Sequence, residues 1–450
     1  MPFMNSQPNS HQLISCEECG LVVHVPDIDQ GQTAQCPRCS HALTKINTKP
    51  YQSVIAVAIA CLIMLVLSLS FPFMSFSVKG LSQEITLLHA AKMLAEFHNV
   101  LLGILLLATV VVLPSIYIGL ILYLYFEALK SRRHSATQKP STKQQRRATV
   151  LCRLLFRVEP WLMVDVFLIG VLVSLIKIAS LADIEMGSSF WAFCVYTILV
   201  VKCISMVDKS WLWGHFVPAV ALPNVREGDT HHSHNHVGCH TCHQINPLED
   251  KKHQRCIRCN SVIHQYNPAD NLQKAWALLF ASIIFYIPAN LYPMMYTVSL
   301  GHSEGSTIMQ GVILLWKMGS YPVAMVIFFA SVFIPLAKML ALAWLYYHAQ
   351  KSRHLPYEES ISRLKIYRLT EFIGRWSMID IFVVAILVAL VQLQNLMAIY
   401  PGPAALSFAA VVIFTMLSAM IFDSRLLWQA PKNEVQEPIS DNLKEKANYE

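Results

Sequence analysis

Long apolar runs alternate with short polar segments along this chain. A helix that crosses a bilayer needs about 20 mostly apolar residues, and windows of that length occur eight times. The run 381–422 contains no charged residue and is too long for one crossing, but the Tyr-Pro-Gly-Pro segment at 400–403 divides it. The predicted transmembrane helices cover residues 51–74, 100–125, 161–181, 189–211, 275–295, 321–347, 376–397 and 404–422.

The basic residues indicate how these helices are oriented. Nine lysines and arginines lie within residues 130–157 and six within 351–375, whereas the loops 183–188 and 396–403 contain none. Positive charge gathers on the cytoplasmic side of membrane proteins, so we expect the basic loops and both termini in the cytoplasm. The net charge of +7 is therefore a signal of topology and does not indicate nucleic-acid binding.

Composition agrees with this interpretation. Of the 450 residues, 54% are hydrophobic and only 14% are charged, which is typical of a multi-spanning membrane protein. The first fifty residues are polar and lack the apolar core of a signal peptide. We therefore expect the first apolar segment to remain in the mature protein as a transmembrane helix.

The two halves of the chain match each other without gaps. The motif Pro-x-Met recurs 221 residues apart, at 72 and 293, and Trp-x-Met-x-Asp recurs 215 residues apart, at 161 and 376. Four spans in each half would make these parallel repeats. Further pairs at the spacing of 215 are Arg153 with Arg368, Gly187 with Gly402, Asp208 with Asp423, and Trp213 with Trp428.

Eight cysteines form two sets of paired CxxC motifs. In the first set sixteen residues separate the pairs, and in the second set thirteen. Four thiolates so spaced make a closed tetrahedral site that favours zinc, with iron as the main rival metal. Disulfides or free thiols are the alternative, but a cytoplasmic location argues against disulfides. The two sets are Cys16, Cys19, Cys36 and Cys39, and Cys239, Cys242, Cys256 and Cys259.

These features predict an all-α integral membrane protein, built as a tandem repeat of four transmembrane helices with a small cytoplasmic zinc ribbon before each repeat. A Pro- and His-rich linker joins the halves, and a disordered cytoplasmic tail ends the chain. The predicted domains are the first zinc ribbon (11–50), the first membrane domain (51–215), the linker (216–238), the second zinc ribbon (239–270), the second membrane domain (271–430) and the tail (431–450).

Six histidines lie just before and within the second cysteine set. They could capture a metal ion or replace a cysteine ligand, but such a run is more often a solvated linker, and we favour that interpretation. The six are His231, His232, His234, His236, His240 and His243.

Five ionisable side chains lie at predicted membrane depth: Asp165, Lys177, Lys202, Lys338 and Asp380. A charge in lipid is costly unless it faces a cavity or a partner, so all five are candidates for a substrate pathway or for proton coupling. The two aspartates lie near the cytoplasmic interface, where pairing with arginines is the more common role. The two lysines at 202 and 338 are unmatched across the repeat, and we expect both to face a polar interior pocket.

Five prolines lie within the predicted spans. Each removes a backbone hydrogen bond and can kink its helix, which would supply a hinge or a cavity wall. Ordinary kinks, which are frequent in membrane helices, are an equally good interpretation. The five are Pro72, Pro114, Pro288, Pro293 and Pro335.

Together the motifs resemble those of the bacterial paraquat-inducible protein A family, over most of the chain. The sister LetA family shares this architecture and is the second choice. The His231–His243 run departs from the family pattern. Besides the cysteine sets, the resemblance rests on Glu84-Ile-Thr-Leu-Leu88, Val207-Asp-Lys-Ser-Trp-Leu-Trp213, Gly311-Val-Ile-Leu-Leu-Trp316, Gly319-Ser-Tyr-Pro-Val323 and Gly374-Arg-Trp-Ser-Met-Ile-Asp380.

This resemblance implies a component of the bacterial inner membrane that takes part in intermembrane transport. It implies a periplasmic MCE-domain protein and an outer-membrane lipoprotein as partners, with membrane lipids as the substrate. The residues themselves leave two other classes open: a membrane redox enzyme that uses the CxxC pairs, and a structural anchor for a periplasmic partner. Because the phosphate-binding loop, Gly-x-Ser-x-Gly and His-Glu-x2-His motifs are all missing, we expect a protein that is not an enzyme.

Overall fold

The computed structural model describes most of the chain. The described residues are 13–26, 31–45, 51–78, 81–89, 92, 100–134, 142–178, 183–233, 235–248, 254–263, 267–299, 302–317, 319, 321–351, 356–390, 392–393 and 397–428.

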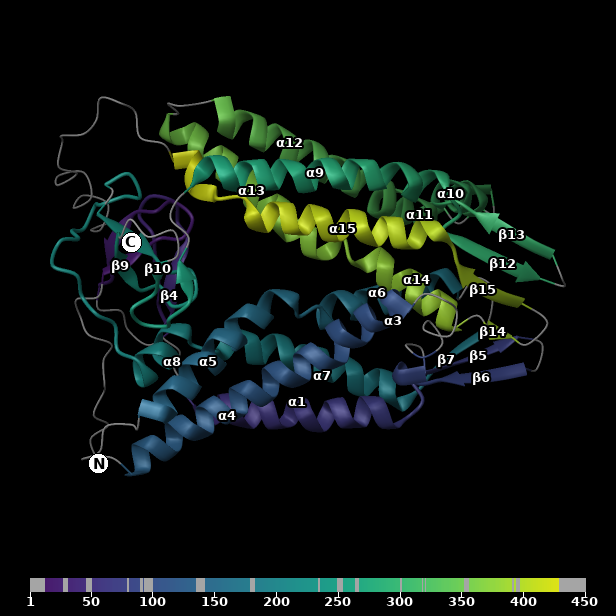
Figure 1. Ribbon diagram of the computed structural model, residues 1–450. Helices are drawn as coiled ribbons and strands as arrows, with labels where there is room; N and C mark the ends of the chain where they lie inside the picture. The colour runs from purple at the N-terminus through teal and green to yellow at the C-terminus, as the bar shows by residue number, and fades with distance from the viewer. Residues whose placement is uncertain are drawn as a thin grey trace.

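Helices make up most of both halves and run roughly along one direction (Figure 1). The first half contains α1 (Gln52–Ser70), α3 (Val100–Leu107), η1 (Ala108–Val112), α4 (Leu113–His134), α5 (Thr142–Val158), η2 (Glu159–Trp161), α6 (Val164–Ile178), α7 (Ser188–Met206) and α8 (Lys209–Phe216). The second half contains α9 (Pro268–Leu291), α10 (Ile308–Lys317), α11 (Tyr321–Phe328), η3 (Phe329–Phe333), α12 (Ile334–Lys351), α13 (Tyr357–Trp376), α14 (Ile379–Leu390), α15 (Pro403–Ile421) and η4 (Ser424–Trp428).

Seven of the described helices are long and apolar enough to cross a membrane. The seventh predicted span, 376–397, is occupied instead by the end of α13, by α14 and by two strands, and α14 has only 12 residues. The eight-span arrangement therefore stays a prediction. The seven candidates are Gln52–Ser70, Gly103–Lys130, Lys143–Leu175, Ser188–Met206, Pro268–Leu291, Ala324–Lys351 and Pro403–Ile421.

Each half carries a small antiparallel sheet at the end of the helices opposite the cysteine ribbons, which we call the sheet end. The strand orders are β6-β5-β7 and β13-β12-β15-β14. The all-α prediction is wrong here, because segments such as Met-Ser-Phe-Ser-Val alternate apolar and polar residues with the period of a strand. The strands are β5 (Met74–Val78), β6 (Leu81–Ile85), β7 (Asp183–Met186), β12 (Met295–Ser299), β13 (His302–Ser306), β14 (Gln392–Leu393) and β15 (Met397–Pro401).

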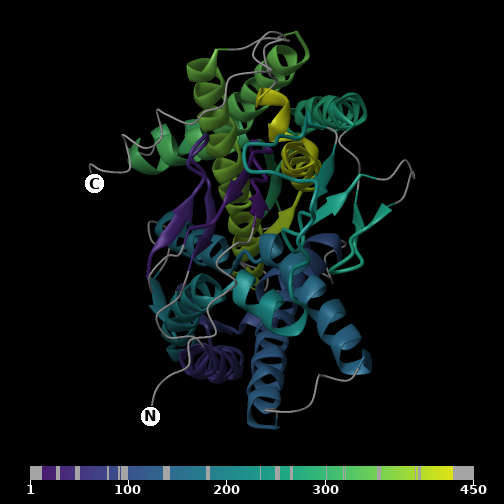
Figure 2. The same cartoon turned by 90° about the vertical axis from the view of Figure 1, so that its left-hand side faces the viewer.

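Among the described residues, the opposite end, which we call the ribbon end, carries four two-stranded sheets (Figure 2). Two belong to the first ribbon, within residues 13–45, and two to the second ribbon, within residues 236–263. Their strands are β1 (Leu13–Ser15), β2 (Val22–His24), β3 (Thr33–Gln35), β4 (Ala42–Lys45), β8 (His236–Gly238), β9 (Ile245–Pro247), β10 (Gln254–Arg255) and β11 (Val262–Ile263).

The two halves meet where α6 packs against α14. A Cβ added at Gly170 would lie 3.0 Å from the Cβ of Phe382, so glycine permits the close approach of the two helices. The Phe167 and Phe382 rings meet edge to face at 5.4 Å. Ser174 on α6 also donates to the backbone oxygen of Val383 on α14, at 3.4 Å. Burial of this face joins the first and second halves through one core.

Two of the five prolines do not lie within helices as predicted. Pro72 and Pro293 follow α1 and α9, which end at Ser70 and Leu291, because proline cannot continue a helical hydrogen-bond ladder. Pro288 lies inside α9. Pro114 lies two residues after the end of the π-helical segment η1, and Pro335 lies two residues after the end of η3. The two π-helical segments occupy corresponding positions in the two halves. The helical ladder is thus altered at the same place in each half.

Candidate metal centres and the interface between them

The first ribbon brings four buried sulfur atoms together. Cys16 Sγ lies 3.5 Å from Cys39 Sγ, and Cys19 Sγ lies 3.5 Å from Cys36 Sγ. All four lie within 4.8 Å of one another. Zinc–sulfur bonds of about 2.3 Å place the sulfurs of a tetrahedral site roughly 3.8 Å apart, so this cluster has the size of a metal site.

The second ribbon repeats this arrangement. Cys239 Sγ lies 3.6 Å from Cys259 Sγ, and Cys242 Sγ lies 3.5 Å from Cys256 Sγ. None of these cysteines forms a disulfide in the described structure. Both clusters are buried and could hold a metal ion, and four thiolates would leave that ion no open position.

A tight turn after each CxxC pair aims the sulfurs at one point. The backbone N–H of the residue after the second cysteine donates to the carbonyl of the first, at 2.8 Å in the first ribbon and 2.9 Å in the second. The residue that donates this bond has a left-handed backbone at each turn, with φ of +70° at Gly20 and 55° to 56° at the three others. The three others are Ser40, His243 and Asn260.

Each ribbon docks on the half of the protein that it does not directly precede in the sequence. The first ribbon packs against the second half, where Arg368 of α13 donates to the backbone oxygen of Cys39 at 2.8 Å. The second ribbon packs against the first half, where Arg153 of α5 donates to the backbone oxygen of Cys259. The two arginines are a matched pair of the internal repeat. The two ribbons therefore dock in the same way, each on a different half.

A second pair of matched contacts joins each ribbon to the same half of the protein. The guanidinium of Arg38, in the first ribbon, lies 4.7 Å from the ring centroid of Trp428. That of Arg258, in the second ribbon, lies 5.9 Å from the ring centroid of Trp213. Such cation–π contacts contribute about 1 kcal/mol each. The repeat pairs of tryptophans and arginines are the feature of the sequence from which this docking could have been predicted.

Glu18 strengthens the docking of the first ribbon. Burial raises the pKa of its carboxyl, but hydrogen bonds from His41 and Arg368 outweigh burial and lower the pKa to about 2. Glu18 is therefore ionised at neutral pH and forms an ion pair with Arg368. The hydrogen bond between His41 and Glu18 also raises the pKa of His41.

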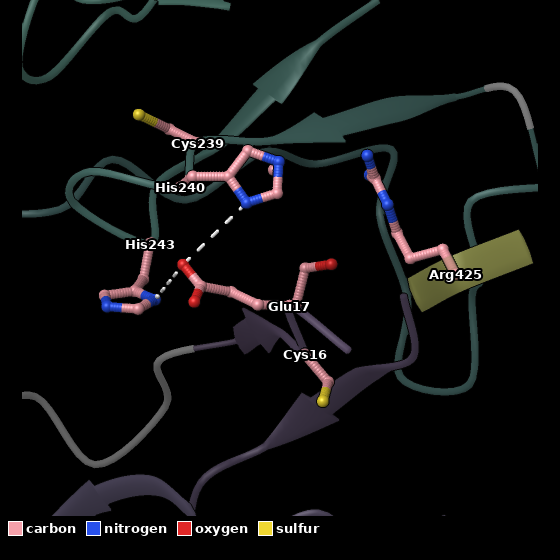
Figure 3. A pocket seen from close by; sticks show the side chains of 8 residues that line it. Cys16, Glu17, Cys239, His240, His243 and Arg425 are labelled. Atoms are coloured by element: carbon pink, nitrogen blue, oxygen red, sulfur yellow. Dashed lines mark ion pairs between the residues drawn. The ribbon is translucent and has the colours of Figure 1, made fainter. Parts of the chain in front are cut away.

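The two ribbons also contact each other (Figure 3). Val22 of the first ribbon exchanges backbone hydrogen bonds with Asp229 and Gly228 of the linker before the second ribbon, at 2.8 and 2.9 Å. Glu17 Oε1, also from the first ribbon, lies 3.4 Å from Nδ1 of His243 and 4.0 Å from Nδ1 of His240. Figure 3 shows the two imidazoles approaching the Glu17 carboxylate from the second ribbon.

The histidine run is not the solvated linker that we expected. His231 and His236 are buried against the ribbons, and burial lowers the pKa of His231 to about 2 and also lowers that of His236. Both are therefore neutral at pH 7. The described residues show no histidine within either cysteine cluster. His234 lies outside the described residues.

The ionisable residues in the membrane helices divide into inner and outer positions. Lys338 on α12 is 4% exposed and donates to the hydroxyl of Thr415 on α15 at 3.1 Å. Lys202 is exposed on the outside of α7, so its expected position in an interior pocket is wrong: a long side chain near the end of a helix can reach the interface. Asp165 is partly buried in the first turn of α6. The side chains of Lys177 and Asp380 lie outside the described part.

Comparison with known proteins identifies the family. The model of the family described as paraquat-inducible protein A matches twice, over residues 51–217 and 272–432. The chain belongs to this family. The two matches correspond to the two halves that the internal repeat predicted, and each contains one set of membrane helices.

Relatives of the chain match it along almost its whole length. The intermembrane transport protein PqiA of Escherichia coli (strain K12) is 41% identical over 94% of this chain and 97% of its own. A probable intermembrane transport protein of Haemophilus influenzae is 29% identical over 95% of this chain and 99% of its own. The lipophilic envelope-spanning tunnel protein A of Escherichia coli is 28% identical over 92% and 91%. No solved structure was found to match. The seven apolar helices and these relatives make this a multi-pass membrane protein.

Proposed function

We propose that this protein is the inner-membrane component of an intermembrane transport pathway that moves lipid, or another hydrophobic substrate, and maintains the cell envelope. The observation that carries the proposal is the match with named intermembrane transport proteins over 94% of the chain. Its partners are a periplasmic MCE-domain protein and an outer-membrane lipoprotein. The relatives are named as transport proteins, which supports a role other than that of an enzyme.

In this proposal each half crosses the membrane four times, with α14 as the short third helix of the second half. The ribbon end and both termini face the cytoplasm, and the sheet end faces the periplasm. The basic residues at the end of α4 and along α5 support this orientation, because these parts of the two helices lie toward the ribbons (Figure 1). Both cysteine clusters hold structural zinc, which their buried four-sulfur geometry suits. The domain boundaries predicted from the sequence are also part of this proposal.

The substrate pathway passes close to Lys338 in the second half. A lysine buried among apolar helices is costly, and a single hydroxyl partner at 3.1 Å offsets little of that cost. A phosphate headgroup, or a proton relay that includes the aspartates at 165 and 380, would use such a charge. Lys202 and Lys177 remain weaker candidates, Lys202 because it is exposed on the outer surface.

Photocrosslinking from the interior tests this function. A photoreactive residue at Thr415, which is 2% exposed, cannot reach the lipids that surround the protein, so capture of lipid there requires lipid to enter. We expect capture at Thr415, and less of it with Lys338→Met. Val200 is the matched position in the first half, is also 2% exposed and serves as the control.

Purification from native membranes supplies the second readout, the presence of a periplasmic MCE-domain protein. Absence of both captured lipid and this partner would contradict the proposal. The redox alternative would then be tested by measuring electron transfer to quinone, and the anchor alternative by activity that survives Lys338→Met.

A further inference from the structure

A stripe of exposed side chains runs along η3 and α12 and changes character toward the ribbon end, where α12 finishes (Figure 1). Apolar residues come first, then two aromatic residues with a polar edge, and finally a lysine. This is the order in which a membrane helix meets acyl chains, the interface and headgroups, so the stripe faces lipid. It consists of Phe333, Leu336, Leu340, Trp344, Tyr347 and Lys351.

A buried guanidinium lies beside the aromatic part of this stripe. Arg363 of α13 is only 8% exposed, and its Cζ lies 6.0 Å from the ring centroid of Trp344. Its Nη2 atom donates to Glu359 at 3.2 Å. The Nη1 atom is buried and donates no hydrogen bond in the described structure. A buried, charged N–H group without an acceptor is unfavourable, so this place suits an anionic ligand.

The neighbouring side chains add positive charge and ring surface. His348 stacks close to Trp344, with the ring centroids 4.4 Å apart. Lys351, in the last turn of α12, places Nζ 5.7 Å from the ring centroid of Tyr347. The first half has no such feature, because Ala148 occupies the position that matches Arg363.

We propose that Arg363 and Trp344 form a binding site for an anionic phospholipid in the membrane leaflet nearest the ribbon end. The guanidinium binds the headgroup phosphate through parallel N–H groups, as arginine does between membrane helices. An arginine side chain is long enough to turn its charged end toward the interface, which brings Nη1 to the phosphate beside Trp344. One acyl chain lies along Leu340 and Leu336. The site would bind lipid whether or not the protein transports it.

A lipid bound here would affect the docking of the first ribbon. Arg363 lies on the same helix as Arg368, which donates to the backbone oxygen of Cys39. At the start of this helix the hydroxyl of Tyr357 donates to the backbone oxygen of Arg38 at 2.9 Å. A headgroup that holds α13 against α12 would therefore also hold the surface on which this ribbon docks.

Lipid binding to the purified full-length protein tests the site. Native mass spectrometry measures the affinity for phosphatidylglycerol and for diacylglycerol, which has the same acyl chains but no phosphate. We expect Arg363→Met to weaken the binding of phosphatidylglycerol roughly 10-fold, as loss of a hydrogen-bonded charge would, and to leave that of diacylglycerol unchanged. Lys365→Met removes an exposed lysine from the same helix and is the matched control. It should bind both lipids as the unaltered protein does.

Arg363→Lys keeps the positive charge without the parallel N–H groups, so it should retain part of the affinity. This variant decides the matter if Arg363→Met loses both lipids through misfolding. Unchanged affinity for phosphatidylglycerol in both variants would make Arg363 a partner of Glu359 only. An equal loss in Lys365→Met would mean general attraction between charges. Competition by millimolar inorganic phosphate would assign the site to a free anion. Each of these three results overturns the proposal.

Discussion

Gly20 lies in the turn after the first CxxC pair, at a position where any side chain would meet a neighbouring residue. A methyl group there would lie 2.5 Å from Nδ1 of His231, within the interface between the ribbon and the histidine segment. A positive φ alone does not demand glycine, because Ser40 and Asn260 adopt φ of 56° at equivalent turns. The requirement for glycine at this turn therefore comes mainly from packing against His231.

We expect Gly20→Ala to destabilise the ribbon end by about 2 kcal/mol, since overpacking of a buried contact typically costs 1–3 kcal/mol. Thermal unfolding of the detergent-solubilised protein measures the loss. Adding His231→Ala should recover part of it, and Ser40→Ala should have a small effect. A loss that is unchanged in the double variant would show that backbone strain, and not His231, is the cause.

Arg368 supports the first cysteine cluster from outside, through the carbonyl of Cys39. Groups that orient metal ligands typically affect metal affinity by about 10–100-fold. In protein loaded with Zn²⁺, we expect Arg368→Ala to speed the loss of zinc from the first ribbon to a chelator by roughly 10-fold. Lys365→Ala, an exposed lysine on the same helix, is the control. Equal zinc loss from the two variants would contradict a role for Arg368.

At the scale of elements, α7 and α15 each begin against the end of another helix. A Cβ at Gly187 would overlap the backbone oxygen of Pro72, and one at Gly402 would overlap that of Pro293. These contacts join α1 to α7 and α9 to α15, the main helix pairs of the two halves. They also explain why both glycines and both prolines match across the repeat.

Gly187→Ala and Gly402→Ala should each lower the thermal unfolding temperature of the protein, because the obstructing atoms belong to the backbone and cannot rotate away. A cost of about 1–3 kcal/mol is expected for overpacking of this kind. Gly119→Ala in α4 is the control, since nothing lies within 4 Å of its Cβ position. Similar unfolding temperatures for all three variants would contradict the close contact.

Helices and cysteine clusters were predictable because apolar runs and CxxC spacing are local in the sequence. The sheets at the sheet end were not, because short strands such as Gln392–Leu393 pair with distant segments and carry little pattern of their own. For a similar reason, the sequence could not predict that Lys338 is buried and Lys202 exposed. Both lie in apolar runs, and only the packing of neighbouring helices decides which side each one faces.

At the scale of the whole molecule, the crossed docking makes each ribbon a support for the opposite half. Changing Cys36 and Cys39 to serine should therefore increase hydrogen exchange about 10-fold or more in α13 and η4, while α1 changes little. Changing Cys256 and Cys259 to serine should expose α5 and α8 instead. Mass spectrometry of exchanged peptides measures both. Deprotection of the half that directly follows each altered ribbon in the sequence would contradict this docking.

The separation of the docking partners also sets an order of assembly during synthesis. Arg153 and Cys259 are 106 residues apart, whereas Cys39 and Arg368 are 329 residues apart. At about 5–20 residues per second, the first ribbon waits roughly 16–65 s for its partner after it leaves the ribosome. The first half and the second ribbon are thus completed early. Translation that stops before α13 would leave the earliest-made ribbon without its binding surface, available to chaperones and proteases.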